Sequence, residues 1–505
     1  MNMIARRIFL SSMLALLTLG AAAQYRDGVT EEERTGDQPV LLSLEDALKI
    51  ALAENVSVQL ADLEIEKAGY SKKGTYAQLF PQVNGTGSYQ RTIKKQVMYM
   101  DGMGGGSNMY ASLLQPVYDA VEAATGQKVT VPDGDSSSSL PSGGIEVGRW
   151  NTYSAGVTAA MPLVNAQLWK SLEVSGQEVE LAVEKARSSR LEMVTQVKQA
   201  FFGVLLAKEA FNVYKEVYEN AVTNFEQTQR RFNAQKASEL DLTRSKTAVA
   251  NAIPNVYNAE SSVILALWQL KAVMGVDLDR DIDVKGTLDD YSGQMLRDLT
   301  EHENASLEYN STMRQLAIQA EELANAVKIQ QYAYLPTLNL SFSYAMNAMT
   351  NDFKFNEYQW TPYSFVGLSL NIPIFSGGKR WSDVKVARTQ ATQLQLTRLN
   401  TERQLKIAIR QYLTTMETQM KNYESSREAV ALAQKAYDIS AKSYQVGKNT
   451  LTDLNDAQLA LTQAQLAQSQ AIYNFVVAKS NLEQTLGADF IDPDGKYNPD
   501  MFNRK

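Results

Sequence analysis

The stretch LKIAIRQYLTTMETQMKNYESSREAVALAQKAYDISAKSY, residues 405–444, decides the fold. Along it, apolar, aromatic and small side chains, with one glutamine among them, recur at alternating steps of four and three residues, the spacing of a coiled-coil seam. The seam consists of Leu405, Ile409, Tyr412, Met416, Gln419, Tyr423, Ser426, Val430, Ala433, Tyr437, Ser440 and Tyr444. The first half of the chain has the same spacing from Tyr214 to Phe232. An unbroken helix over 166–234 would be on the order of 100 Å long, so we predict an elongated helical body.

The chain carries the same plan twice. Five markers recur 212 residues later, with no gap across the whole stretch. They are Phe232, Lys236, Asp241, Leu242 and Gly275, which recur as Tyr444, Lys448, Asp453, Leu454 and Gly487. Earlier markers keep the same order, because Phe80-Pro81 recurs as Leu335-Pro336 and Met161-Pro162 as Ile372-Pro373. Such self-similarity predicts two equivalent structural repeats.

Each repeat is predicted to contain one long helical hairpin and two strands. The hairpins span 164–275 and 377–487, with tight turns over 233–239 and 445–449, where Gly447 permits a left-handed backbone. The strands lie at about 82–94, 148–162, 337–347 and 363–374, because apolar and polar residues alternate there. A soluble β-sandwich and a lipid-facing β-barrel would both produce this alternation of apolar and polar residues. The alternation alone therefore does not distinguish the two architectures.

The remaining segments are assigned by composition. Residues 1–23 are expected to be a cleaved signal peptide, because Arg6 and Arg7 precede an apolar run that ends in three alanines. The first repeat is then 24–275, an acidic linker follows over 276–300, the second repeat is 301–487 and the tail is 488–505. The Gly-, Ser- and Met-rich stretch 94–148 is expected to be a long loop between two strands.

Composition excludes several classes of function. The chain of 505 residues has no cysteine and one histidine, His302, which excludes disulfides, thiolate nucleophiles, cysteine zinc sites and multi-histidine metal sites. The net charge is −7, and it becomes −9 without the two arginines of the signal peptide, which argues against a nucleic-acid partner. No nucleophile–base pair, phosphate loop or dinucleotide motif is present, so we expect no enzyme and no cofactor.

Two weak metal motifs remain. Alternate acids over 277–283 resemble the start of a calcium loop, but Ile282 stands where the turn needs glycine and Leu288 where the bidentate Glu should be. A solvated linker is the simpler interpretation. The four methionines within 98–109 carry thioether groups, which are soft ligands of the kind that Cu(I) prefers. Because no His or Cys accompanies them, a flexible loop rich in methionine is the simpler interpretation.

Taken together, the markers resemble the TolC-like outer membrane efflux proteins. The features are the duplicated plan, Leu335-Pro336 at strand entry, the run 372–378 at strand exit, and Tyr444-Gln445-Val446-Gly447 with Asp453 at the hairpin tip. The resemblance implies an α+β membrane protein, a homotrimer in which four strands per protomer form one twelve-stranded β-barrel, continued by an α-helical coiled-coil tunnel in the periplasm. It implies an exit duct in the bacterial outer membrane, surrounded by lipid, for efflux or type I secretion. A periplasmic adaptor and an inner-membrane pump, such as an RND or ABC transporter, would be its partners.

The resemblance also assigns roles to residues at the tips. Asp453 and Asp456 match an acidic pair that rings the periplasmic constriction, although the positive end of a helix dipole would also favour carboxylates there. Asp241 and Tyr444 match residues whose contacts hold that end closed. Asn449 stands where the family has an arginine, with Lys448 as a possible substitute. The adaptor would dock at the tips, around Phe232, Lys236 and Gly447.

Two other classes remain open from the residues. A secreted coiled-coil scaffold would explain the heptads, but it would not explain four alternating strands beside prolines. A soluble periplasmic binding protein would need a ligand pocket, whereas the polar residues here lie on periodic faces.

Overall fold

The computed structural model describes residues 40–98, 106–127, 145–295, 306–354 and 357–487. The expected signal peptide, His302 and the 488–505 tail lie outside the described residues, as does part of the methionine cluster. No helix among those ranges is long and apolar enough to span a membrane.

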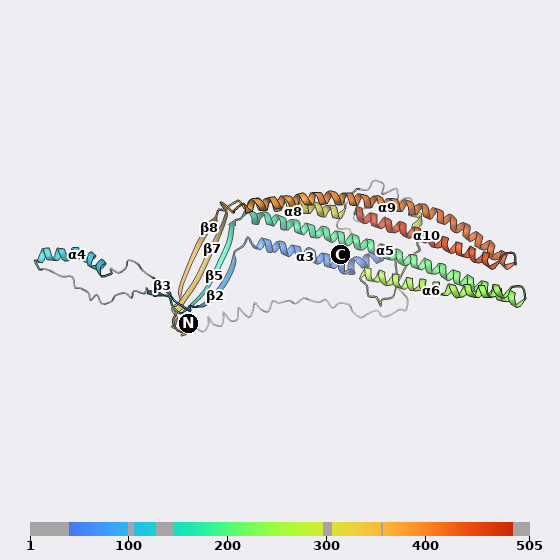
Figure 1. The fold of residues 1–505 in the computed structure, drawn as a ribbon, viewed down its shortest axis with the longest axis horizontal. Helices are drawn as coiled ribbons and strands as arrows, with labels where there is room; N and C mark the ends of the chain where they lie inside the picture. The colour runs from blue at the N-terminus through green and yellow to red at the C-terminus, as the bar shows by residue number, and fades with distance from the viewer. Residues whose placement is uncertain (1–39, 99–105, 128–144, 296–305, 355–356, 488–505) are drawn as a thin grey trace.

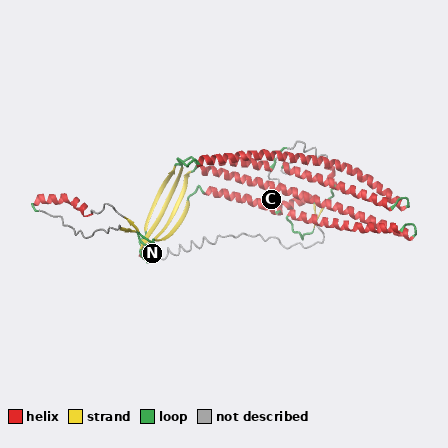
Figure 2. Cartoon of the chain, viewed as in Figure 1, coloured by secondary structure: helices red, strands yellow, loops and turns green. Residues whose placement is uncertain are grey.

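The molecule is elongated, with a sheet toward one end and long helices extending away from it (Figures 1 and 2). Two helices run nearly the whole length of the helical body, α5 (Ala166–Asn233) and α9 (Lys379–Gln445). Each turns back into a shorter helix, α6 (Glu239–Met274) and α10 (Leu451–Leu486). The shorter helices α2 (Leu44–Glu54), α3 (Val56–Ala77) and α8 (Ser311–Tyr332) complete the body.

The sheet has four antiparallel strands in the order β2-β5-β7-β8. They are β2 (Gln82–Arg91), β5 (Asn151–Val164), β7 (Thr337–Thr350) and β8 (Thr361–Asn371). Cross-strand register separates two faces, since Leu340 pairs with Leu368 on one face and Asn339 with Ser369 on the other. Among the described residues, β2 and β8 each have a strand partner on one side only.

The described part of the linker between the repeats is folded, although Asp277, Asp279 and Asp281 are exposed, as a solvated acidic segment predicts. There β6 (Ile282–Val284) pairs in parallel with β1 (Val40–Leu42), followed by the short 3-10 helix η1 (Asp289–Gln294). Ile282 and Leu288 are buried. The acids alternate with these apolar residues, which is the pattern of a half-buried strand.

The stretch 94–148 also contains more than a loop. The short strands β3 (Gln96–Met98) and β4 (Ile145–Val147) pair with each other, and α4 (Gly106–Thr125) lies between them in the sequence. The glycines and serines of this stretch obscured the helix, because they lower the helical propensity of its beginning.

The main core lies midway along the helices. It packs side chains of α2, α5, α6 and α10 together with β6 and the segment after it, and its largest fully buried members include Phe201, Leu270 and Phe475. An ion pair between Lys198 and Glu483, 2.8 Å long, joins α5 to α10 beside this core. The core therefore fixes both hairpins at their bases and leaves their tips free to extend.

Two asparagines join the ends of helices in the same way in both repeats. Asn55 begins α3, where its Oδ1 accepts from the Ser57 N–H at 2.8 Å and its Nδ2 donates to the Val273 carbonyl of α6 at 2.6 Å. Asn310 begins α8 and makes the equivalent bonds, 2.8 Å from Met313 N–H and 2.6 Å to the Thr485 carbonyl of α10. Each side chain thus caps the start of one helix and the end of another.

Glycine makes this approach possible. Gly275 ends α6 in the left-handed conformation at φ 76°, and a Cβ there would lie 2.8 Å from the Glu54 carbonyl oxygen. Gly487 ends α10 in the same way at φ 71°. The conserved geometry of the two helix junctions within one chain shows that the duplication extends to individual hydrogen bonds.

Candidate functional site

The turns of the two hairpins lie together at the end of the molecule farthest from the sheet (Figure 1). The two turns have the same hydrogen bonds. Lys236 N–H donates to the Arg231 carbonyl at 2.7 Å, and Lys448 N–H donates to the Ser443 carbonyl at 2.8 Å. These bonds satisfy carbonyls that the helix end leaves without partners.

The left-handed position of each turn is occupied by a different residue. Gly447 has φ 77°, as expected for a glycine at the end of a helix, whereas its counterpart Gln235 has φ 57°. A side chain in this region is strained. The first turn therefore accepts strain that the second avoids.

Each return helix begins with a capping box. Asp453 Oδ2 accepts from the Thr450 hydroxyl at 2.7 Å and from its backbone N–H at 3.0 Å, and the Thr450 hydroxyl oxygen accepts from Asp453 N–H. Ser238 and Asp241 make the equivalent box at the start of α6. The hydrogen bonds from the Thr450 side chain and then its backbone hold the pKa of the Asp453 carboxyl below its ordinary value. Asp453 is therefore an anion at neutral pH.

Asp456 lies nearly one helical turn beyond Asp453, and both side chains are exposed. Two anions on the first turns of α10 create a negative surface at the tip of the second hairpin. The first hairpin has only Asp241 at the matching positions, because Arg244 occupies the position that corresponds to Asp456. The spacing of Asp453 and Asp456 is thus not repeated at the first tip, whose two first-turn acids are Glu239 and Asp241.

Tyr444 fastens one hairpin to the other. Its side chain is buried, and its hydroxyl lies 2.6 Å from the Thr228 hydroxyl of α5. The Arg231 guanidinium donates to the Tyr444 carbonyl at 2.7 Å and lies 5.1 Å from the centre of the tyrosine ring. We call Thr228, Arg231 and Tyr444 the tip clasp.

The tip clasp adds Thr228 and Arg231 to the residues that the sequence singles out at the tips. The role of Asp241 and Tyr444 in holding that end closed stays a prediction. Within the protomer the Asp241 carboxylate accepts a hydrogen bond from the Ser238 hydroxyl. Lys448 is exposed and Asn449 is half-buried, and no ion pair within the described residues includes Lys448. The cation beside Tyr444 is instead Arg231 of the other hairpin.

The expected docking residues Phe232, Lys236 and Gly447 are all exposed on the tips. Sequence reasoning missed Thr228, Arg231 and Gln235. Gln235 could have been found from its displacement of 212 residues to Gly447. Nothing local in the sequence pairs Thr228 or Arg231 with a tyrosine more than 200 residues away.

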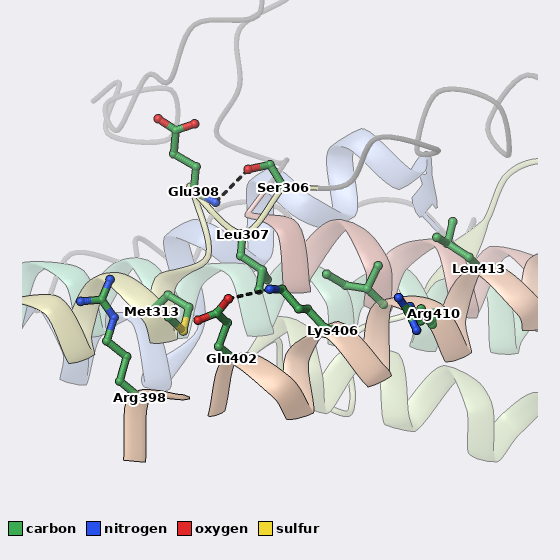
Figure 3. A pocket seen from close by; sticks show the side chains of 10 residues that line it. Ser306, Leu307, Glu308, Met313, Arg398, Glu402, Lys406, Arg410 and Leu413 are labelled. Atoms are coloured by element: carbon green, nitrogen blue, oxygen red, sulfur yellow. Dashed lines mark hydrogen bonds and ion pairs between the residues drawn. The ribbon is translucent and has the colours of Figure 1, made fainter. Parts of the chain in front are cut away.

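A second candidate region lies far from the tips, where α8 begins beside α9. A cavity of about 840 Å³ is bordered there by Leu307, Met313 and Leu413, with charged side chains around it (Figure 3). Glu402 and Lys406 form an ion pair 2.6 Å long on its α9 side. Mixed charges on an open surface provide no defined ligand geometry. Within the described ranges, no cluster of three or more acidic or histidine side chains could hold a metal ion.

The chain is similar in sequence and in fold to known outer membrane proteins. The chain is 22% identical to outer membrane protein TolC of Escherichia coli strain K12 over 354 residues, covering 67% of this chain and 70% of that protein. It is 21% identical to the cobalt-zinc-cadmium resistance protein CzcC of Cupriavidus metallidurans over 386 residues, covering 76% and 87%. The CmeC outer membrane channel of Campylobacter jejuni has a TM-score of 0.63 at 17% identity, covering 91% of this chain and 90% of that one, which shows a shared fold.

The family model described as outer membrane efflux protein matches residues 47–276 and 304–488. These ranges include both hairpins, the four-stranded sheet and both tips. Because the match extends over most of the sequence, the chain belongs to the outer membrane efflux protein family.

Proposed function

We propose that three copies of this chain form one continuous duct, in which their strands close a twelve-stranded β-barrel and their helices form a coiled-coil tunnel. The observation that carries this proposal is the open edge of the protomer. The sheet ends in two strands, β2 and β8, each paired on one side only among the described residues. Four strands are too few to close a barrel, whereas bacterial outer-membrane barrels begin at about eight.

The helical body supports the same assembly. Contacts run from α3 to α5, from α5 to α8 and from α8 to α9, so these helices form an open row below the sheet. The row ends at α3 on the β2 side and at α9 on the β8 side. Large apolar side chains are exposed on the end helix α9, such as Leu399 and Leu432. A neighbouring copy would bury such side chains and pair the open strands.

The two faces of the sheet predict which side meets lipid. Leu338, Leu340, Phe342 and Leu368 would face lipid, and Ser341, Ser343 and Ser369 would face the lumen. Single cysteines can test this, because the chain contains none. In intact outer membranes, a water-soluble thiol reagent should label cysteines at the serine positions and spare those at the leucine positions. The opposite labelling pattern would mean that the two faces of the sheet are wrongly assigned, and it would refute the barrel with the leucines toward lipid.

The remaining organisation follows from the duct. Residues 1–23 direct export and are removed, the two repeats 24–275 and 301–487 each supply half of the protomer's strands and helical hairpins, and 276–300 joins them. An inner-membrane pump and a periplasmic adaptor engage the exposed tips. The protein is a conduit and performs no catalysis of its own.

We place the cation-selective constriction at Asp453 and Asp456. Three protomers would bring six such carboxylates to one axis, and a ring of this kind attracts cations. The variant Asp456→Asn removes the charge without disturbing the capping box, whereas Asp453→Asn also weakens that box. In planar bilayers, Asp456→Asn should lower cation selectivity and weaken block by a trivalent cation. Glu424→Asn, on the exposed surface of α9 away from the tip, is the control. If both variants and the parent have the same cation selectivity and the same block by the trivalent cation, Asp453 and Asp456 only stabilise the start of the helix.

A further inference from the structure

The helix α4 is the part of the chain that the duct does not explain. It lies beyond the end of the sheet opposite the helical body (Figure 1), on the connection from β2 to β5. The paired strands β3 and β4 form a stem between the sheet and this helix. None of the other described helices or strands packs extensively against α4.

One face of α4 has the spacing of a coiled-coil seam. Leu114, Val117, Val121 and Ala124 follow one another at steps of three, four and three residues. Leu114 is 45% exposed, Val117 57% and Val121 41%. Most helical stability comes from packing of an amphipathic face, and Pro116 inside this helix lowers its intrinsic stability further. The apolar face of α4 is therefore expected to pack against a partner surface.

Charge narrows the choice of partner. Residues 106–125 contain no lysine or arginine, whereas helices that bind anionic membrane surfaces are rich in both. The two acids, Asp119 and Glu122, lie at outer heptad positions when Leu114 is at a and Val117 at d. Positions beside the seam, including Tyr118 and Ala120, are uncharged. Identical helices can thus approach in parallel without repulsion between their contacting faces.

From these observations we propose that the α4 helices of three copies pack along this seam into a three-helix bundle on the channel axis, above the outer mouth of the duct. In the first heptad Leu114 is at a and Val117 at d, and leucine at a with a β-branched residue at d favours three or more strands over two; in the second heptad Val121 is at a and Ala124 at d. The inference rests on the proposed trimer, in which three β3–β4 stems would stand around one axis. Cargo would then leave the duct between the stems, below the bundle.

Disulfide cross-linking of the full chain in outer membranes tests the bundle. Leu114→Cys and Val117→Cys place single thiols on the seam, and Asp119→Cys places one on the outer face as the control. A disulfide needs Cα atoms within about 7 Å, so mild oxidation should shift both seam variants from monomer to dimer on non-reducing gels and leave the control as monomer. The use of two seam positions keeps the test valid if one variant misfolds.

The mass of the parent in detergent separates this inference from the proposed duct. If the parent is a trimer and neither seam variant forms dimers, the bundle is refuted and the duct stands. If Asp119→Cys forms dimers as readily as the seam variants, the helices collide at random and the bundle is equally refuted. If the parent is a monomer, both proposals fail.

Discussion

Removing either hydroxyl of the tip clasp should have unequal effects, because the structure identifies the donor. The Thr228 hydroxyl lies 2.8 Å from the Asn224 carbonyl, to which it donates its single hydrogen. In the 2.6 Å contact between Thr228 and Tyr444, the tyrosine hydroxyl is therefore the donor. Both side chains are shielded from water, at 0% exposure for Thr228 and 4% for Tyr444.

The magnitudes follow from what each substitution leaves behind. Tyr444→Phe removes one neutral hydrogen bond and leaves only an acceptor lone pair unused, which costs about 1 kcal/mol. Thr228→Val leaves the tyrosine hydroxyl buried without an acceptor, which costs roughly 1–3 kcal/mol. The double variant replaces both partners by apolar groups of similar shape, so its cost should fall below the sum of the two single costs.

Hydrogen exchange at the ends of α5 and α9 in the solubilised protein is the suitable assay, since local opening need not follow global unfolding. The free energy of opening should fall more in Thr228→Val than in Tyr444→Phe. Thr223→Val is the matched control, because that exposed hydroxyl bonds only to the Glu219 carbonyl one turn earlier. Equal losses in the two single variants, or strict additivity in the double variant, would refute the assignment of the donor.

The same substitutions test whether the clasp holds the tips together in the duct. A loss of about 1 kcal/mol raises an opening equilibrium roughly fivefold. Open probability in planar bilayers should therefore rise in both single variants and more in Thr228→Val. An unchanged open probability with increased exchange would mean that the clasp stabilises the hairpins without controlling conduction.

Three further predictions concern the caps and turns. Asn310→Ala should lower the free energy of unfolding by roughly 2–4 kcal/mol, the combined cost of a lost N-cap and of a part-buried carbonyl without its donor. Asn55→Ala should cost less, because Asn55 is half-buried whereas Asn310 is buried, and thermal unfolding followed by circular dichroism should give this order. Gly447→Ala should cost about 1 kcal/mol at its positive φ, while Gln235→Gly should be neutral or stabilising in the same assay, and the reverse order would contradict the strain argument. The folded pKa of Asp453 is lowered, so its capping box stabilises α10 above the ordinary carboxyl pKa and loses that contribution as the pH falls through the lower value. After correction for the intrinsic exchange rate at each pH, the free energy of opening at the start of α10 should therefore fall on acidification in the parent, but much less in Asp453→Asn.

Local periodicity was sufficient to predict much of the fold. The heptads predicted the long helices, and the alternation around Leu340 and Leu368 predicted two of the strands, which the structure has at Thr337–Thr350 and Thr361–Asn371. The constant displacement from Asp241 to Asp453 also marked two equivalent helix starts. These features depend on neighbours within one or two turns, so a single sequence contains them.

Contacts between distant segments were decided only by the tertiary structure. Nothing near Tyr444 in the sequence points to Thr228, which lies 216 residues earlier, and nothing near Asn55 points to Val273. The folded linker around Ile282 was missed for the same reason, because its burial depends on β1 and the central core rather than on its own acidic composition. The sequence by itself determined the two long helical hairpins, the four strands of the sheet and their duplication. Packing between distant segments determined which side chains join them, since such partners are brought together only by the folded chain.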